Sequence, residues 1–424
     1  MKYARNKISI SIAGAIAVLL PLSVSADASY DALKAQVEVL QKQLEKVQEQ
    51  LEAQEERSVT KNEVKVLEKE IVKASEWQTP NTLIHMAGYG DVGYEKSYGD
   101  DDDGSFRMGN FAPIFHFQYR DLVMLEAELE ITVEDDGETN TELEYMSIDF
   151  FLNDYMALVG GKFLSPIGQF RQNLHPSWIN KMASAPPGFG HDGAAPVSDI
   201  GFQLRGGLPA FGNVRTNYAI FVSNGPTLEF EDGALEGIDA EGFNKDADGD
   251  KVVGGRFAIL PVPSLEIGLS GATGKTAVNK DDGDSIDIKE EGNRDYDVYG
   301  ADFSYDLRSL ETQWLQGLGL RGEYVKSKVG STDKGEAASA GAKWTTWYTQ
   351  AAYRIPSTQF ETVIRYTDFN SAIDSGDQKQ WALGVNYLFS NSFIGKVNYE
   401  WNDGIEPNSS ADSNRFLFQL AYGF

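Results

Sequence analysis

The sequence predicts an all-β protein, a 16-stranded antiparallel transmembrane β-barrel that follows a periplasmic α-helical coiled coil. Three observations support this prediction: strand-like alternation from residue 81 onward, connections that alternate between short and long, and a glycine-free heptad pattern before residue 77. The last strand illustrates the alternation, because every second residue from Phe416 to Phe424 is apolar or aromatic. A lone strand in lipid would leave backbone groups unpaired, so strands of this kind have to close into a barrel.

A secretory leader is expected at the start of the sequence. Three basic residues precede an apolar run at 8–22, which is followed by the small-residue triplet Val-Ser-Ala at 24–26. We therefore expect residues 1–26 to form a signal peptide that is removed. An N-terminal membrane anchor is disfavoured, since the run is short for a span and contains Pro21 near its end.

Residues 27–76 predict a periplasmic coiled-coil segment. Apolar residues recur there at spacings of three and four over about three heptads, which is the pattern of a helix that packs on a partner helix. We expect the segment to help a homo-oligomer assemble, and the alternatives are a helical hairpin folded on itself or a solvated linker. The seam consists of Tyr30, Leu33, Val37, Leu40, Leu44, Val47 and Leu51.

Residues 81–424 predict the transmembrane β-barrel, with strands of alternating hydrophobicity separated by turn residues. Short turns such as Asn153-Asp154 and Pro356-Ser357 alternate with longer loops, which is typical of outer-membrane barrels with periplasmic turns and extracellular loops. A barrel of sixteen strands is wide enough for a water-filled channel. The expected strands are 83–98, 106–119, 122–134, 142–152, 155–164, 197–207, 212–223, 251–260, 264–274, 293–307, 317–328, 343–355, 358–368, 379–389, 393–402 and 413–424.

These features together resemble Gram-negative outer-membrane porins, in particular the phosphate-selective porin O and P family and its coiled-coil-bearing relatives. The resemblance covers about residues 27–424, and the segment Gly-Lys-Phe-Leu-Ser-Pro-Ile-Gly at 161–168 is its nearest local match. It implies a homotrimeric diffusion channel in the outer membrane, in contact with lipid and lipopolysaccharide. It also implies that Phe424 and Tyr422 form the assembly signal.

The connection at 165–196 is predicted to be the constriction loop. It is the longest loop and is rich in proline and aromatic residues, with one acidic residue, Asp192. Long loops in compact proteins are usually functional, and in the porins that this chain resembles the third external loop folds into the lumen. The alternative is an external lid or a trimer contact. The residues expected at the constriction are Arg171, His175, Lys181 and His191.

Strand parity predicts which charged side chains line the lumen. Charged walls select ions by sign, so the expectation is a porin for small hydrophilic solutes or ions, with either a weak anion preference or none. Inward arginines and glutamates that only neutralise each other are the alternative. The expected wall residues are Arg205, Arg215, Arg256, Arg321, Arg354, Arg365, Glu126, Glu128 and Glu130, and Arg415 shares their parity.

The composition argues against other functions. The chain has 64 acidic and 37 basic residues, which disfavours nucleic acid as a partner, and no cysteine. His85 and His116 could be neighbours, but no nucleophile motif accompanies them, so we expect no enzymatic activity, no cofactor and no metal site. The acidic loop at 246–250 is only a weak match to a calcium loop. A barrel that serves as a sheath, scaffold or adhesin is the alternative function.

The coiled-coil segment generates a first prediction. Replacing both Leu40 and Leu44 by Asp places charges in the seam, so the oligomer mass measured by light scattering should fall while the barrel still folds. Replacing Gln41 and Gln43 by Asp, outside the seam, is the control and should leave the mass unchanged. An unchanged mass in the Leu variant would show that the coil is not needed for assembly.

Overall fold

The computed structural model describes residues 42, 46, 81–98, 104–190, 193–210, 212, 214–231, 234–246, 248–278, 293–307, 312, 315–332, 341–372, 376–404 and 412–424. The chain divides into two units, residues 1–77 and 78–424. In the first unit only Lys42 and Lys46 are described, and both are helical and exposed. The predicted signal peptide and the seam of the coiled coil therefore lie outside the described residues, and they stay predictions.

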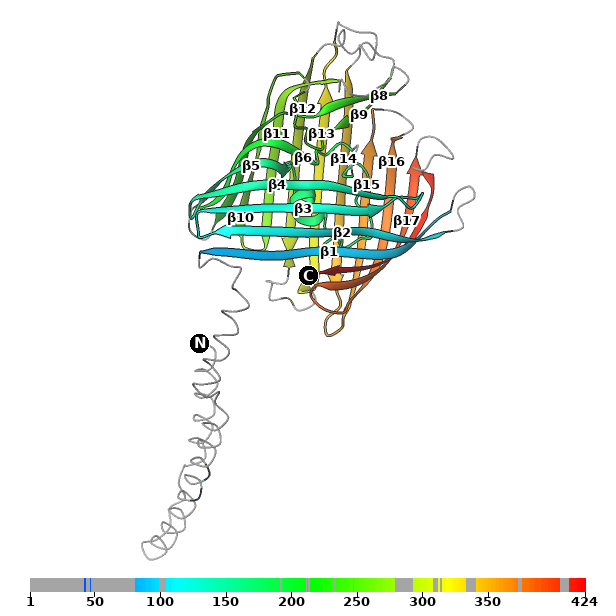
Figure 1. Ribbon diagram of the computed structural model, residues 1–424. Helices are drawn as coiled ribbons and strands as arrows, with labels where there is room; N and C mark the ends of the chain where they lie inside the picture. Colours follow the sequence, from blue (N-terminus) through cyan, green and yellow to red (C-terminus); the bar gives the residue numbers. More distant parts are fainter. Residues whose placement is uncertain are drawn as a thin grey trace, which may run out of the picture. The chain divides into compact units, whose positions relative to one another are not determined.

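The second unit is a closed antiparallel barrel of sixteen strands (Figure 1). Each wall strand pairs with the next one along the chain, and the last pairs with the first, so the wall has no free edge. The predicted sixteen-stranded antiparallel barrel is confirmed, and every predicted strand is found to within a few residues. The wall strands are β1 (Thr82–Ser97), β2 (Ser105–Tyr119), β3 (Val123–Val133), β4 (Thr139–Asn153), β5 (Met156–Leu164), β6 (Ser198–Pro209), β7 (Arg215–Ser223), β10 (Val252–Val262), β11 (Leu265–Val278), β12 (Arg294–Asp306), β13 (Leu318–Val329), β14 (Ala342–Arg354), β15 (Phe360–Asn370), β16 (Gln378–Leu388), β17 (Phe393–Gly404) and β18 (Arg415–Gly423).

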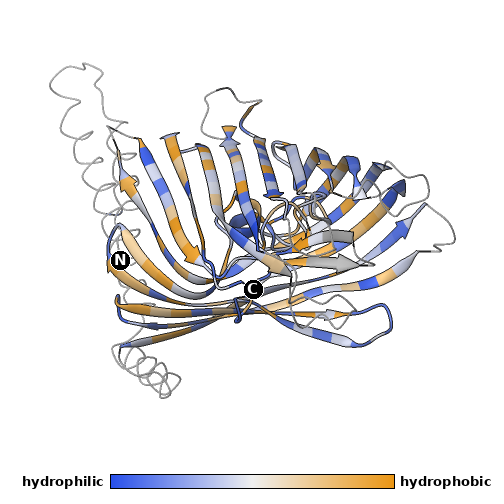
Figure 2. Cartoon of the chain, turned by 90° about the horizontal axis from the view of Figure 1, so that it is seen from above, coloured by the Kyte–Doolittle hydropathy of each residue, from blue (hydrophilic) through white to orange (hydrophobic). Residues whose placement is uncertain are grey.

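The two faces of the wall differ in polarity. On β16, Trp381, Leu383 and Val385 are exposed on the outside, whereas the alternate residues Gln380 and Asn386 are buried on the inside. The same alternation colours the strands in Figure 2. An apolar outer surface around a closed barrel is what a bilayer requires. The protein is therefore an outer-membrane β-barrel.

The last strand closes the barrel as its sequence pattern predicts. Tyr422 and Phe424 are exposed on the outside, while Gln419 and Ala421 are buried on the inside. Backbone hydrogen bonds join Phe424 and Gly88 in both directions, at 3.0 and 2.9 Å. Among the described residues, no helix is both long and apolar enough to cross a membrane.

A short hairpin, which was not expected from the sequence, is present in addition to the sixteen wall strands. Strand β8 (Thr227–Glu231) pairs with β9 (Ala234–Asp239), and its start pairs in parallel with the end of β11. The hairpin sequence is rich in acidic residues. It is ordered against the wall because Leu228 and Ile238 are buried in an apolar cluster with inward-facing residues of the barrel.

Candidate functional site

The connection between β5 and β6 packs against the inner face of the wall. It contains one π-helical turn, η1 (Phe170–Leu174), and its other residues form bends and turns. Its backbone hydrogen-bonds to inward-facing side chains of β11, β13, β14, β15, β16 and β17. Because these partners are inward-facing side chains of the wall, the connection lies inside the barrel. We call residues 165–196 the inner loop.

The first half of the inner loop is held by Glu323 on β13. Its Oε2 accepts hydrogen bonds from the backbone N–H groups of Gln169 and Phe170, at 3.2 and 3.0 Å. Gly168 precedes them with φ of 76°, and a Cβ there would lie 1.6 Å from Glu323 Oε1. The left-handed backbone and the close carboxylate both require glycine. The carboxylate thus takes up backbone donors that no strand neighbour could satisfy.

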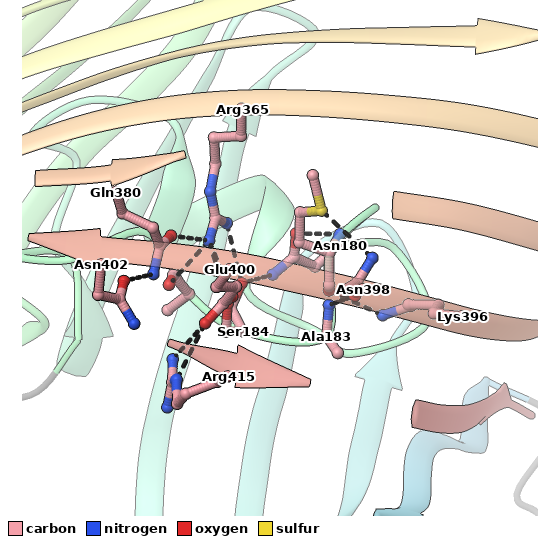
Figure 3. Close-up of polar contacts among 12 residues, drawn as sticks. Asn180, Ala183, Ser184, Arg365, Gln380, Lys396, Asn398, Glu400, Asn402 and Arg415 are labelled. Carbon is pink, nitrogen blue, oxygen red and sulfur yellow. Dashed lines mark hydrogen bonds and ion pairs between the residues drawn. The ribbon is translucent and has the colours of Figure 1, made fainter. Parts of the chain in front are cut away.

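The second half is held by a polar network on β15 to β18 (Figure 3). Lys396 is fully buried, and its Nζ donates to the carbonyl oxygens of Ser177 and Met182 at 2.5 and 3.0 Å and to Gln419 Oε1 at 2.7 Å. Arg365 donates to the carbonyl oxygens of Ser184 and Ala185, at 2.9 and 3.3 Å. These cations satisfy backbone carbonyls that the loop cannot pair with itself.

A second anchor in the same network combines a hydrogen bond and an ion pair. Glu400 accepts a hydrogen bond from the Ser184 hydroxyl, and its Oε2 lies 2.7 Å from Arg415 Nη2. Beside it, Asn398 Oδ1 accepts from the backbone N–H of Ala183 at 2.7 Å. The loop is therefore tied to β17 by side chains at two alternate inward positions.

Apolar contacts fill the inner face next to β12, β13 and β14. The rings of Phe170 and Phe189 in the inner loop pack edge to face on Tyr348, with centroid distances of 6.5 and 5.2 Å. Val298 and Trp344 join the same buried cluster from the wall. This apolar cluster differs from the charged inner face that strand parity predicts. The signal was present as valine and aromatic residues at inward parity on these strands.

The structure places the predicted constriction residues in different surroundings. Arg171 is buried, with Nη1 4.0 Å from Glu144 Oε1; burial lowers the pKa of Arg171, and the nearby Glu144 carboxylate opposes this effect. Lys181 lies in the second half of the loop, and its Nζ is 3.2 Å from Oε1 of Glu361 on β15. His175 faces Glu128, and His191 lies outside the described residues. Arg171 in the inner loop thus faces the Glu144 carboxylate of β4.

Three of the six predicted wall arginines, Arg205, Arg256 and Arg365, have carboxylate partners. Arg256 donates to Asp302 Oδ2 at 2.9 Å and to Glu266 Oε1 at 2.8 Å, and Arg205 pairs with Asp149. Paired charges of this kind neutralise each other locally. Among the other three, Arg354 donates to the carbonyl oxygen of Gln359 at 3.2 Å. Arg321 forms no ion pair within the part of the chain that the structure describes, and Arg215 is exposed at the start of β7.

The predicted acidic wall on β3 has hydroxyl partners. Tyr145 donates to Glu126 Oε1 at 2.8 Å, and Tyr89 donates to Glu128 Oε1 at 2.9 Å. Glu130 has the same parity on β3. The predicted neighbours His85 and His116 are confirmed, because their Nδ1 atoms lie 3.3 Å apart. The described residues contain no group of three or more His, Cys, Asp or Glu that could hold a metal ion.

Three polar cavities border the inner loop. The first, of about 510 Å³, begins at the short turn Asn153-Asp154, and it shares Gln172, Asn173, Gln203 and Arg205 with a second of about 270 Å³. We call the second the acidic cavity, because Glu126 and Glu128 line it together with His175. The third, of about 530 Å³, is lined by Lys181, Arg321, Arg354, Glu361 and Asp306 among others. We call it the basic cavity, and it shares no lining residue with the other two.

Comparison with known proteins identifies the fold. No family model and no curated protein matches the sequence. Among solved structures, the anion-selective porin from Comamonas acidovorans matches 81% of this chain and all of its own, with a TM-score of 0.54 and 16% identity. Salmonella typhi OmpF in complex with daunomycin matches 81% of this chain and 98% of its own, with a TM-score of 0.51 and 14% identity. At these identities the similarity establishes the fold of outer-membrane porins.

The anchors of the inner loop generate a second prediction. Replacing Lys396 by Met removes three hydrogen bonds from a buried cation and leaves two loop carbonyls unpaired, which should lower the free energy of loop opening by about 3 kcal/mol. Trypsin should then cut the folded protein after Arg171 or Lys181 about a hundredfold faster. Replacing Lys379, exposed on β16, by Met is the control. Equal cleavage rates in both variants would show that Lys396 does not hold the loop.

Proposed function

We propose that this protein is an outer-membrane porin through which small hydrophilic solutes diffuse passively. The observation that supports this best is the inner loop, which packs against the wall of a sixteen-strand barrel and still leaves polar cavities on both of its sides. In this proposal the loop is the constriction, and solutes cross beside it. No reaction and no cofactor are involved.

The proposal includes the partners that the sequence implied. The apolar outer face lies in outer-membrane lipid, with lipopolysaccharide as a neighbour, and the protein acts as a homo-oligomer, most simply a trimer. The coiled-coil segment at 27–76 assists assembly, and Tyr422 and Phe424 serve as the assembly signal. The relationship to phosphate-selective porins remains a prediction, since no family model matches.

The charges beside the inner loop support two opposite selectivities. Arg321 and Arg354 lie at the basic cavity, which favours the predicted weak anion preference. Glu126 and Glu128 lie at the acidic cavity, which opposes it. The sign of the preference is therefore a prediction that the reversal potential decides.

Conductance in planar bilayers tests the proposal directly. Purified protein should form open channels, and deleting residues 171–191 should raise the single-channel conductance because the deletion empties the lumen of its packed loop. The Lys396→Met variant offers a milder release of the same loop, with noisier current as the expected result. A folded, heat-modifiable barrel without current would contradict the porin proposal and favour a sheath or scaffold.

The basic cavity generates a fourth prediction. Replacing Arg321 and Arg354 by Gln should shift the reversal potential in a salt gradient toward cations, because two positive charges leave the lining. Replacing Lys343 and Lys379 by Gln removes the same charge at exposed positions, where salt screens it within about 10 Å at 0.1 M. If both pairs shift the potential equally, the basic cavity does not contribute to selectivity.

A further inference from the structure

The acidic cavity contains two carboxylates, Glu126 and Glu128, whose nearest basic groups are histidines. Glu128 is almost completely buried, and Glu126 is partly buried two residues away on the same face of β3. Both accept a tyrosine hydroxyl, and the other close groups are histidines, with His175 Nε2 at 3.7 Å from Glu128 and His116 Nε2 at 3.7 Å from Glu126. Among the described residues, no Lys or Arg forms an ion pair with either carboxylate. A buried carboxylate without a cation is costly.

The nitrogen of His175 that faces Glu128 has no hydrogen-bond partner. Nδ1 of His175 contacts the carbonyl oxygen of Arg171, and a carbonyl can only accept, so Nδ1 carries a hydrogen. In neutral His175 the Nε2 atom is then a lone pair directed at Glu128, and it has no hydrogen-bond partner. A donor placed between the two would satisfy both groups.

Gln203 is a second, independent polar group of the acidic cavity that has no hydrogen-bond partner in the protein. It lines the acidic cavity from β6, is 1% exposed, and neither its amide oxygen nor its amide nitrogen has a partner. Buried amides are normally hydrogen-bonded, because desolvation without a partner costs about 1–3 kcal/mol. Gln203 and His175 thus line the same cavity, and each has side-chain atoms without a hydrogen-bond partner.

The rest of the lining indicates which kind of cation fits. Ile114, Val159 and Phe163 form an apolar wall in the same cavity. Apolar side chains cannot coordinate a metal ion, and the cavity volume of about 270 Å³ is far larger than the volume of one ion. An ammonium group supplies three donors and a positive charge, and its hydrocarbon part can lie on the apolar side. Glu126 and Glu128 are about 7 Å apart along the strand, which suits one amine or the two ends of a short diamine.

We propose that the acidic cavity is a binding site for small organic solutes that carry a protonated amine, held by Glu126, Glu128, His175 and Gln203. The first cavity connects it toward the short turn Asn153-Asp154 through shared lining residues. Amines therefore pass on this side of the inner loop and bind transiently there. This inference rests on the proposed porin function and assigns a solute class to one of its passages.

Current block by matched probes tests the site. In planar bilayers, 1,4-diaminobutane should reduce the current at a concentration at least about tenfold below that of 1,4-butanediol, which has the same chain without charge. The calcium ion carries the same double positive charge as the protonated diamine, and succinate carries the opposite charge. Calcium chloride and sodium succinate should both block less than the diamine. Block by calcium equal to block by the diamine would overturn the amine site and leave only a general cation effect.

Two variants locate the site. Replacing Glu126 and Glu128 together by Gln should raise the half-blocking diamine concentration about tenfold or more, whereas replacing Glu134 and Glu138 by Gln, in an exposed turn, should not change it. Gln203→Leu removes only the orphan amide, so the barrel should fold normally while the half-blocking concentration rises about threefold. Unchanged block in both cavity variants would overturn the proposal.

Calorimetry separates this inference from the porin proposal. Titration of 1,4-diaminobutane into the protein in detergent micelles should release heat that the Glu126→Gln, Glu128→Gln variant lacks. Binding without any bilayer current would overturn the porin function and retain the amine site. Current without diamine binding or block would overturn the amine site and retain the porin.

Discussion

The structure depends on one constraint: in hydrocarbon, every backbone N–H and C=O group needs a partner within the protein. The antiparallel pairing of β18 with β1 satisfies the backbone groups of the two strands that would otherwise be sheet edges. Gly88 and Phe424 are hydrogen-bonded at one end of this pairing. Closure gives the wall an outside that contacts lipid and an inside that is enclosed. All polar chemistry of the molecule between the two ends of the wall is thereby confined to one face of each strand.

The same constraint reappears inside the barrel, where the inner loop carries backbone groups without strand partners. Side chains of the wall supply them: Glu323 accepts loop N–H groups, while Lys396 and Arg365 donate to loop carbonyls. Charged partners make stronger hydrogen bonds than neutral ones, so a few residues hold a long irregular segment. The charged wall residues nearest the loop, Glu323, Lys396 and Arg365, consequently stabilise the loop. They contribute less to the electric field that a solute in the lumen experiences.

The barrel could be predicted from the sequence because its signals are local: period-two alternation, turn residues and inward or outward parity are all visible within ten residues. The surroundings of Arg171, Lys396 and Gln203 could not be predicted, since each depends on a segment far away in the chain. The hairpin β8–β9 was missed for a similar reason, as Leu228 and Ile238 are isolated apolar residues until the wall supplies Val298 and Val325. The sequence identified which residues point inward, and the folded loop decides which of them remain available.

Availability, more than the number of charges, decides what the lumen selects. A carboxylate and a guanidinium in contact, such as Asp302 and Arg256, act on a distant ion only as a small dipole. A lone carboxylate retains its full charge over about a Debye length. The number of inward arginines therefore overstates the positive field, because Arg205, Arg256 and Arg415 are paired with carboxylates. Among the described residues, the hydrogen-bond and ion-pair partners of Glu126 and Glu128 are tyrosine hydroxyls and imidazoles. The uncompensated groups lie on opposite sides of the inner loop, negative at the acidic cavity and positive at the basic cavity, so the loop separates two environments of opposite sign within one barrel.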